Sequence, residues 1–210
     1  MELSNPLGIK YRVVEEITHL GEPARMVSGS ATFETTLEDL WNAVSSPERI
    51  SNWLLPISGE LKLGGHYQLE GHASGKISRC EEPNAFDATW EYGDNVSWIR
   101  VRLDKQQNGA RLTLEHIMSK DAASEDHWRK YGPGATGVGW DLSFLGLHQH
   151  ITSKAPVPQS ELNSWLSSDD GKNFIRECST GWADAHTESG EEESIARNMA
   201  EATRKFYCGE

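Results

Sequence analysis

The sequence predicts an α+β fold in which a curved antiparallel sheet wraps around a long C-terminal helix, followed by a helical extension. Three observations predict it. A strand leads straight into two short helices, strand-like alternation then runs from Gly59 to Met118, and a markedly apolar helical segment runs from Val138 to Ile151. Because short turns join the strands with no helix between them, we expect antiparallel neighbours. This order of elements is that of a helix-grip fold.

A change in hydrophobic period marks the first strand and the two helices. Between Met26 and Phe33, small and apolar residues occupy every second position, which is typical of a strand. Thr35, with Glu38 three residues later, forms a capping-box pattern that predicts a helix start. Ser46-Pro47 predicts a second helix start, with proline at the first helical position.

The middle of the chain alternates with the period of two expected for strands. Leu61 and Leu63 alternate before a Gly64-Gly65 turn, and Asn108-Gly109 is a hairpin signal. Further strands are predicted at Tyr67–Leu69, Gly75–Cys80, Phe86–Trp90, Ile99–Leu103 and Leu112–Met118. In the strand around Ile99–Leu103, the three apolar residues at positions 99, 101 and 103 alternate with Trp98 and two arginines.

The segment from Val138 to Ile151 is apolar over a wide arc. Trp140, Phe144 and Ile151 share one helical stripe, and a second apolar stripe runs beside it. A helix of this kind has to be covered by a sheet or by a partner. The preceding residues 119–136 are polar and contain glycine, so we expect a connecting loop there, or a lid over a cavity.

A shift in composition predicts two parts, a main domain over residues 1–154 and an acidic helical extension over residues 155–210. The extension carries five basic and eleven acidic side chains, and prolines lie near its start. We expect one helix around Phe174 and a second from about Glu191 to Tyr207. The second has an apolar stripe of Ile195, Met199, Ala202 and Phe206. That stripe predicts packing on the domain or, in a homodimer, on a second copy.

Composition excludes several classes of partner. The chain has 210 residues, of which 20 are basic and 32 acidic, so its net charge is −12. Such a chain lacks the basic surface that nucleic acids or anionic membranes require, so we expect neither as a partner. With no apolar run of spanning length and no signal-peptide pattern, we expect a cytoplasmic protein. Its three distant cysteines predict ordinary thiols.

Six local sequences, taken in chain order, resemble one family of helix-grip proteins. They are Thr32–Trp41, Ser46-Pro47-Glu48 with Trp53, Leu63–Tyr67, Gly75–Glu91, Arg111–His116 and Gly139–Leu145. Together they resemble the SRPBCC (START-like) superfamily and, within it, the activator of heat-shock-protein-90 ATPase homologue-like proteins. The resemblance covers roughly residues 24–151 and leaves out the extension.

The resemblance implies an apolar cavity between the sheet and the last helix of the domain. We expect the binding of a small hydrophobic molecule there, without catalysis and without a cofactor. The residues expected to bind this ligand are Trp53, Tyr67, Trp90, Trp98, His116, Trp140 and Phe144. The alternative is that these aromatic side chains fill an ordinary core.

Two other functions stay open. A polyketide cyclase or dehydratase would need an acid or base in the cavity, for which His116 and Tyr67 are the candidates. A stress-related protein that activates a chaperone ATPase is the third possibility, although the Asn-Trp-His-Trp segment of the eukaryotic cochaperone does not occur in this chain.

Histidine patterns favour structural roles. His116 ends an apolar strand face, where a hydrogen-bonded core histidine is the simpler interpretation and a polar anchor the sharper one. His148 and His150 are two residues apart, so on a helix they point about 200° apart and do not share a metal. We therefore expect no metal site.

Overall fold

A computed structural model describes residues 11–210, so the first ten residues of the predicted main domain lie outside the described part. An eight-stranded antiparallel sheet forms the centre of the molecule, in the order β1-β2-β8-β7-β6-β5-β4-β3. Its strands are β1 (Tyr11–His19), β2 (Glu22–Phe33), β3 (Ile57–Gly59), β4 (His66–Leu69), β5 (Ser74–Glu81), β6 (Ala85–Tyr92), β7 (Asn95–Gln106) and β8 (Gly109–Ser119).

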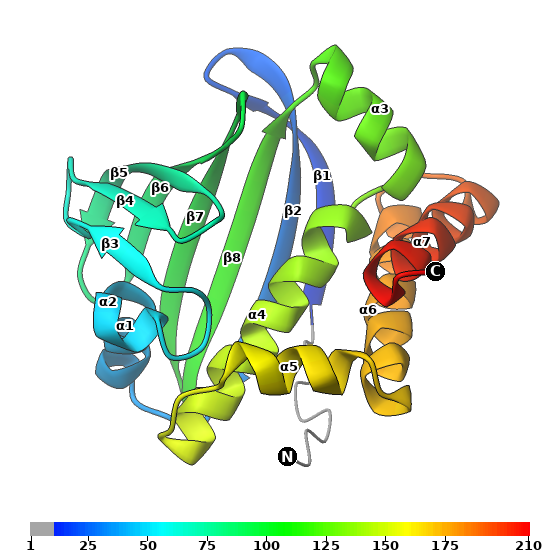
Figure 1. The fold of residues 1–210 in the computed structure, drawn as a ribbon. Coiled ribbons are helices and arrows are strands. Elements are labelled where there is room, and N and C mark those ends of the chain that lie inside the picture. The colour runs from blue at the N-terminus through cyan, green and yellow to red at the C-terminus, as the bar shows by residue number, and fades with distance from the viewer. Residues whose placement is uncertain (1–10) are drawn as a thin grey trace.

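Seven helices accompany the sheet in the described residues. They are α1 (Leu37–Ser45), α2 (Pro47–Ile50), α3 (Ala122–Tyr131), α4 (Gly134–Ser153), α5 (Gln159–Leu166), α6 (Asp169–Glu188) and α7 (Glu193–Cys208). In Figure 1 the sheet curves around α4, with α1 and α2 at one end. The predicted helix-grip fold is therefore confirmed. No helix in the described part of the chain is long and apolar enough to cross a membrane.

Strand register decides which side chains face α4. Val27, His116 and Ile99 are aligned across β2, β8 and β7, and all three are buried. Their sequence neighbours point to the other face, because side chains alternate along a strand. Gly29, two residues after Val27 on β2, lies on the same inner face, and a Cβ atom there would meet the ring of Phe144 at 3.2 Å. Glycine thus lets α4 approach the sheet closely.

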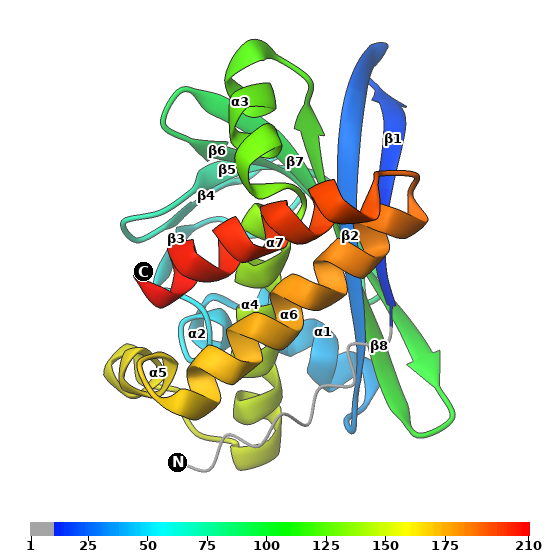
Figure 2. The ribbon, with the colours of Figure 1, turned by 90° about the vertical axis from the view of Figure 1, so that its right-hand side faces the viewer.

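The extension is attached to α4 through a buried carboxylate. Asp141, fully buried, accepts hydrogen bonds from the Arg12 guanidinium at 3.1 Å and from the Trp182 indole at 3.0 Å. The Trp182 ring lies directly over Gly137, where a Cβ atom would come within 2.1 Å of it. Figure 2 shows α6 and α7 packed beside α4 and near β1. One ion pair and one indole therefore join the first strand, the central helix and the extension.

Several predicted elements differ from those observed. Residues 119–136 are not one loop, because Asp121 caps α3 by accepting a hydrogen bond from the Ser124 amide. The Leu61 and Leu63 segment is a loop, and the strand lies earlier, at Ile57–Gly59. The cap of α1 is Thr36 rather than Thr35. The Ser46 cap of α2 is confirmed.

Burial on α7 also differs from the prediction. Met199 is buried, but Ile195 is 40% exposed and Phe206 is 62% exposed. Ala196 and Ala200 turn inward instead and cluster with Ala183 of α6. Small residues bring the two helices close together, so the interface runs along the alanines and not along the larger apolar residues.

Replacing Trp182 with alanine should lower the free energy of unfolding by about 3–5 kcal/mol, because it empties a buried site and leaves Asp141 without its indole donor. Denaturant unfolding of the full chain measures this loss. The matched control, Ile195→Ala on the exposed face of α7, should change stability by less than about 0.5 kcal/mol. Equal effects of the two substitutions would contradict the attachment described here.

Candidate functional site

An apolar cavity lies between the inner face of the sheet and α4. Its empty space amounts to about 870 Å³, which includes the part open to solvent. The 22 residues that line it come from α1, α2, the segments on either side of β3, strands β3 to β8, and α4. None of these lining residues is Asp, Glu, Lys, Arg or His. Cavities lined in this way, by apolar and aromatic side chains, are typical of small-molecule sites.

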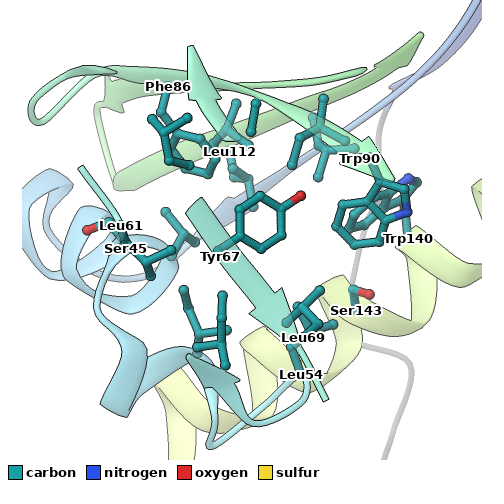
Figure 3. Close-up of a pocket in the computed structure, with 18 of the residues that line it drawn as sticks. Ser45, Leu54, Leu61, Tyr67, Leu69, Phe86, Trp90, Leu112, Trp140 and Ser143 are labelled. Carbon is teal, nitrogen blue, oxygen red and sulfur yellow. The ribbon is translucent and has the colours of Figure 1, made fainter. Parts of the chain in front are cut away.

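Aromatic side chains form much of the wall. Those that line the cavity are Trp41, Trp53, Tyr67, Phe86, Trp90, Trp140 and Phe144. The rings of Trp90 and Trp140 pack edge to face, with centroids 5.0 Å apart and an interplanar angle of 63°. Figure 3 shows this pair at one end of the cavity and Phe86 with Leu112 toward the other.

The Tyr67 ring lines the cavity and lies over β5 at Gly75, where the strand has no side chain. A Cβ atom at Gly75 would lie 2.8 Å from the Tyr67 ring, so the ring can lie over this strand only where no side chain stands. Its hydroxyl reaches β6 and donates to the Thr89 carbonyl oxygen at 2.7 Å. Burial, helped by the nearby Glu91 carboxylate, raises the pKa of Tyr67 well above its ordinary value.

A chain of hydrogen bonds behind the wall holds the Trp90–Trp140 pair. The Trp140 indole donates to Nδ1 of His116 at 3.1 Å, and Nε2 of His116 bonds the Ser97 hydroxyl at 2.8 Å. Ser97 in turn donates to the Trp90 carbonyl oxygen at 3.0 Å. Because an indole can only donate, Nδ1 accepts, which places the proton on Nε2. The chain thus joins α4 to β8, β7 and β6.

His116 is neutral in this arrangement. It is buried, and desolvation lowers its pKa to about 4. It does not line the cavity, and both ring nitrogens have partners. The simpler interpretation from the sequence, a hydrogen-bonded core histidine, fits this placement better than a general base.

The other expected site residues divide between the two faces of the sheet. Trp53 lines the cavity, and its indole donates to the Ala43 carbonyl oxygen at 2.9 Å. Phe144 lines it from α4. Trp98 does not, and the expectation for it is corrected here: it packs against His19 with ring centroids 4.5 Å apart and the rings tilted by 56°. Its neighbour Ile99 faces inward, so the alternation of β7 sends Trp98 to the opposite face.

Sequence reasoning missed part of the wall. Trp41 was recognisable as an apolar position on the α1 stripe and Phe86 as an alternating position on β6, but neither pattern shows which core residues border empty space. Leu54 and Leu61 line the cavity from the irregular segment around β3, where no period exists to be read.

Histidines on α4 have structural partners. Nε2 of His150 accepts a hydrogen bond from Arg49 at 2.8 Å, and its Nδ1 lies 2.9 Å from the Ala155 carbonyl oxygen. His148 lies near Phe33 instead. Within residues 11–210, no three His, Cys, Asp or Glu side chains gather as metal ligands would.

Comparison with known proteins agrees with this geometry. A family model described as activator of Hsp90 ATPase homolog 1-like protein matches residues 34–152, more than half of the chain. The chain belongs to this family. Its fold is accordingly that of the SRPBCC superfamily, as the sequence motifs predicted. A search of curated protein sequences finds no significant match.

Solved structures repeat the fold. The solution structure of CalU16 from Micromonospora echinospora is 24% identical, with a TM-score of 0.70 over 86% of this chain and 96% of that one. Its crystal structure gives 25% identity and a TM-score of 0.65 over 83% and 96% of the two chains. MLL2253 from Mesorhizobium loti is 20% identical, with a TM-score of 0.54, and covers 63% of this chain with all of its own.

Lowering the pH should destabilise the protein through His116. Its folded pKa of about 4 lies below the ordinary 6.5, so between these values the unfolded chain takes up a proton that the folded chain does not. Stability should therefore fall as the pH drops from 6.5 to 4, by up to about 3 kcal/mol from this group. Unfolding curves of the wild type and of His116→Gln across this range isolate the effect. Parallel pH profiles would contradict it.

Proposed function

We propose that the protein binds a small hydrophobic molecule in the cavity between the sheet and α4 and does not transform it. The observation that carries the proposal is the wall itself, which is lined by apolar and aromatic side chains and by no charged residue. Water gains few hydrogen bonds in such a space, so an apolar guest is favoured there.

Binding without catalysis is better supported than a cyclase or dehydratase. The lining residues with a phenol or a thiol group are Tyr67 and Cys80. Burial raises the pKa of Tyr67, and its hydroxyl donates a hydrogen bond to the Thr89 carbonyl oxygen. His116 is held neutral behind the wall. An acid and a base converging on the same point would be needed for proton transfer. The residues at the cavity do not supply such a pair.

The proposal also covers the organisation of the chain. We take residues 1–154 as the binding domain of a cytoplasmic protein and residues 155–210 as an extension that stabilises it. The hydrogen bonds of Asp141 to Arg12 and Trp182 support this role, since the one to Trp182 joins the extension to the helix that lines the cavity. A homodimer through the exposed Ile195 and Phe206 stays a prediction, which sedimentation of the chain at micromolar concentration tests.

Titration of the full chain with the neutral fluorophore N-phenyl-1-naphthylamine tests the proposal. We expect saturable, one-site enhancement of its fluorescence. Ala88→Phe, which places a ring in the cavity, should weaken binding at least tenfold, because Ala88 is buried and lines the empty space. Trp98→Leu, on the opposite face of the sheet, is the matched control and should leave the affinity unchanged.

Circular dichroism first establishes that each variant is folded. If Ala88→Phe does not fold, Trp90→Leu takes its place, with the same expected weakening. Absence of saturable binding by the folded wild type at high fluorophore concentration would overturn the proposal. Equal weakening by Trp98→Leu would mean that the probe binds elsewhere.

A further inference from the structure

A second pocket lies where the extension meets the sheet. Its empty space is about 580 Å³, which includes the part open to solvent. Its walls come from β1 and β2, from Trp128 of α3, and from the end of α6 with the turn that leads to α7. Figure 2 shows this turn beside β1 and β2. The second pocket shares no lining residue with the apolar cavity, and the extension forms one of its sides.

The charge of the second pocket is negative. Three of its lining residues are glutamates and one, Arg25, is basic. Arg25 is compensated by the Glu125 carboxylate, to which both terminal nitrogens of its guanidinium donate. Glu16 is compensated by Lys120, whose Nζ lies 2.6 Å from its carboxylate. In the described part of the chain, Glu191 has no lysine or arginine partner. Its carboxylate therefore leaves the pocket with a charge that a cation would neutralise.

His186 brings a hydrogen-bond acceptor to the same place. Its side chain is only 6% exposed, and neither ring nitrogen has a hydrogen-bond partner among the described residues. Nε2 lies 3.7 Å from Oε2 of Glu191, which is beyond hydrogen-bond distance. Burial lowers the pKa of His186, so its ring is neutral at neutral pH and one nitrogen keeps a lone pair. Because a buried polar group without a partner is costly, a donor from a ligand would be favoured here.

The two acceptors are held in place by their neighbours. The His186 ring packs edge to face on Trp128, with centroids 5.4 Å apart and an interplanar angle of 85°. The Arg25 guanidinium lies over the same indole, 4.6 Å from its centroid. Oε1 of Glu191 accepts from the Glu192 amide at 3.0 Å, which leaves Oε2 as the oxygen toward His186. A ligand therefore finds the pair already ordered, which lowers the entropic cost of binding.

We propose that the second pocket binds the primary ammonium group of a small organic amine, between Nε2 of His186 and Oε2 of Glu191. A primary ammonium has three N–H donors and a positive charge, so one nitrogen donates to both acceptors and neutralises the carboxylate. Two acceptors 3.7 Å apart are close enough for one nitrogen to lie about 2.9 Å from each. A quaternary ammonium supplies the charge without the donors, and an alcohol supplies a donor without the charge.

Calorimetric titration of the full chain with 1,4-diaminobutane, in about 0.15 M salt to screen non-specific attraction, tests the proposal. We expect saturable one-site binding. The bis-quaternary analogue hexamethyl-1,4-butanediammonium carries the same charges without N–H groups and should bind at least tenfold more weakly. The uncharged 1,4-butanediol should also bind at least tenfold more weakly.

Substitutions at the two acceptors locate the site. Glu191→Gln keeps the shape of the side chain and removes its charge, so it should weaken binding of the diamine at least fivefold. Glu192→Gln is the matched control: it removes the same charge one residue away, outside the lining of the pocket, and should change the affinity less than twofold. His186→Phe keeps an aromatic ring against Trp128 and removes both nitrogens, and it should also weaken binding at least fivefold. Circular dichroism first establishes that each variant is folded, and either acceptor variant suffices if the other does not fold.

Four results would overturn the proposal. The first is the absence of saturable binding of the diamine by the wild type. The second is equal affinity for the bis-quaternary analogue, which would indicate only a general attraction to an acidic surface. The third is equal weakening by Glu191→Gln and Glu192→Gln. The fourth is displacement of N-phenyl-1-naphthylamine by the diamine, which would place the amine in the apolar cavity instead.

Discussion

The buried carboxylate of Asp141 fixes the helix on which the cavity depends. Asp141 and Trp140 are neighbours on α4, so they point in different directions around it. Asp141 meets Arg12 of β1 and Trp182 of α6, while Trp140 lines the cavity. Removing Arg12 would leave the Asp141 carboxylate buried without a counter-charge, which is far costlier than losing a surface pair. Removing Trp182 would take away one of its hydrogen-bond donors. The extension thus holds α4 from outside at the residue next to the cavity wall.

From inside, α4 is held by neutral hydrogen bonds. The chain from Trp140 through His116 and Ser97 to the Trp90 carbonyl oxygen orients the Trp140 indole and ties it to the backbone of β6. It works only while His116 is uncharged, because a protonated Nδ1 could no longer accept from the indole. The wall can therefore be strongly apolar and still well ordered, since its polar atoms have partners in the layer behind.

The sequence predicted the parts of the fold that follow a regular period. The meander, the apolar helix and the Ser46 cap were all readable, because alternation or capping chemistry marks them. The polar helix α3 was missed, since its residues carry no clear apolar stripe and only Asp121 signals its start.

For the site, residue type was a better guide than strand face. Trp53, Tyr67, Trp90, Trp140 and Phe144 do line the cavity, but Trp98 was assigned to the wrong face, although its arginine neighbours mark that face as the outer one. Empty space is a property of packing between elements. No pattern within one element could have shown that Leu61 borders it and Leu63, 63% exposed, does not.

The most direct test of the account follows the eight tryptophan indole N–H signals of the ¹⁵N-labelled chain by NMR during titration with N-phenyl-1-naphthylamine. The four that line the cavity, Trp41, Trp53, Trp90 and Trp140, should shift together and saturate. The four that do not, Trp98, Trp128, Trp165 and Trp182, should stay in place. Shifts confined to the second group, or none at saturating ligand, would contradict a hydrophobic guest between the sheet and α4.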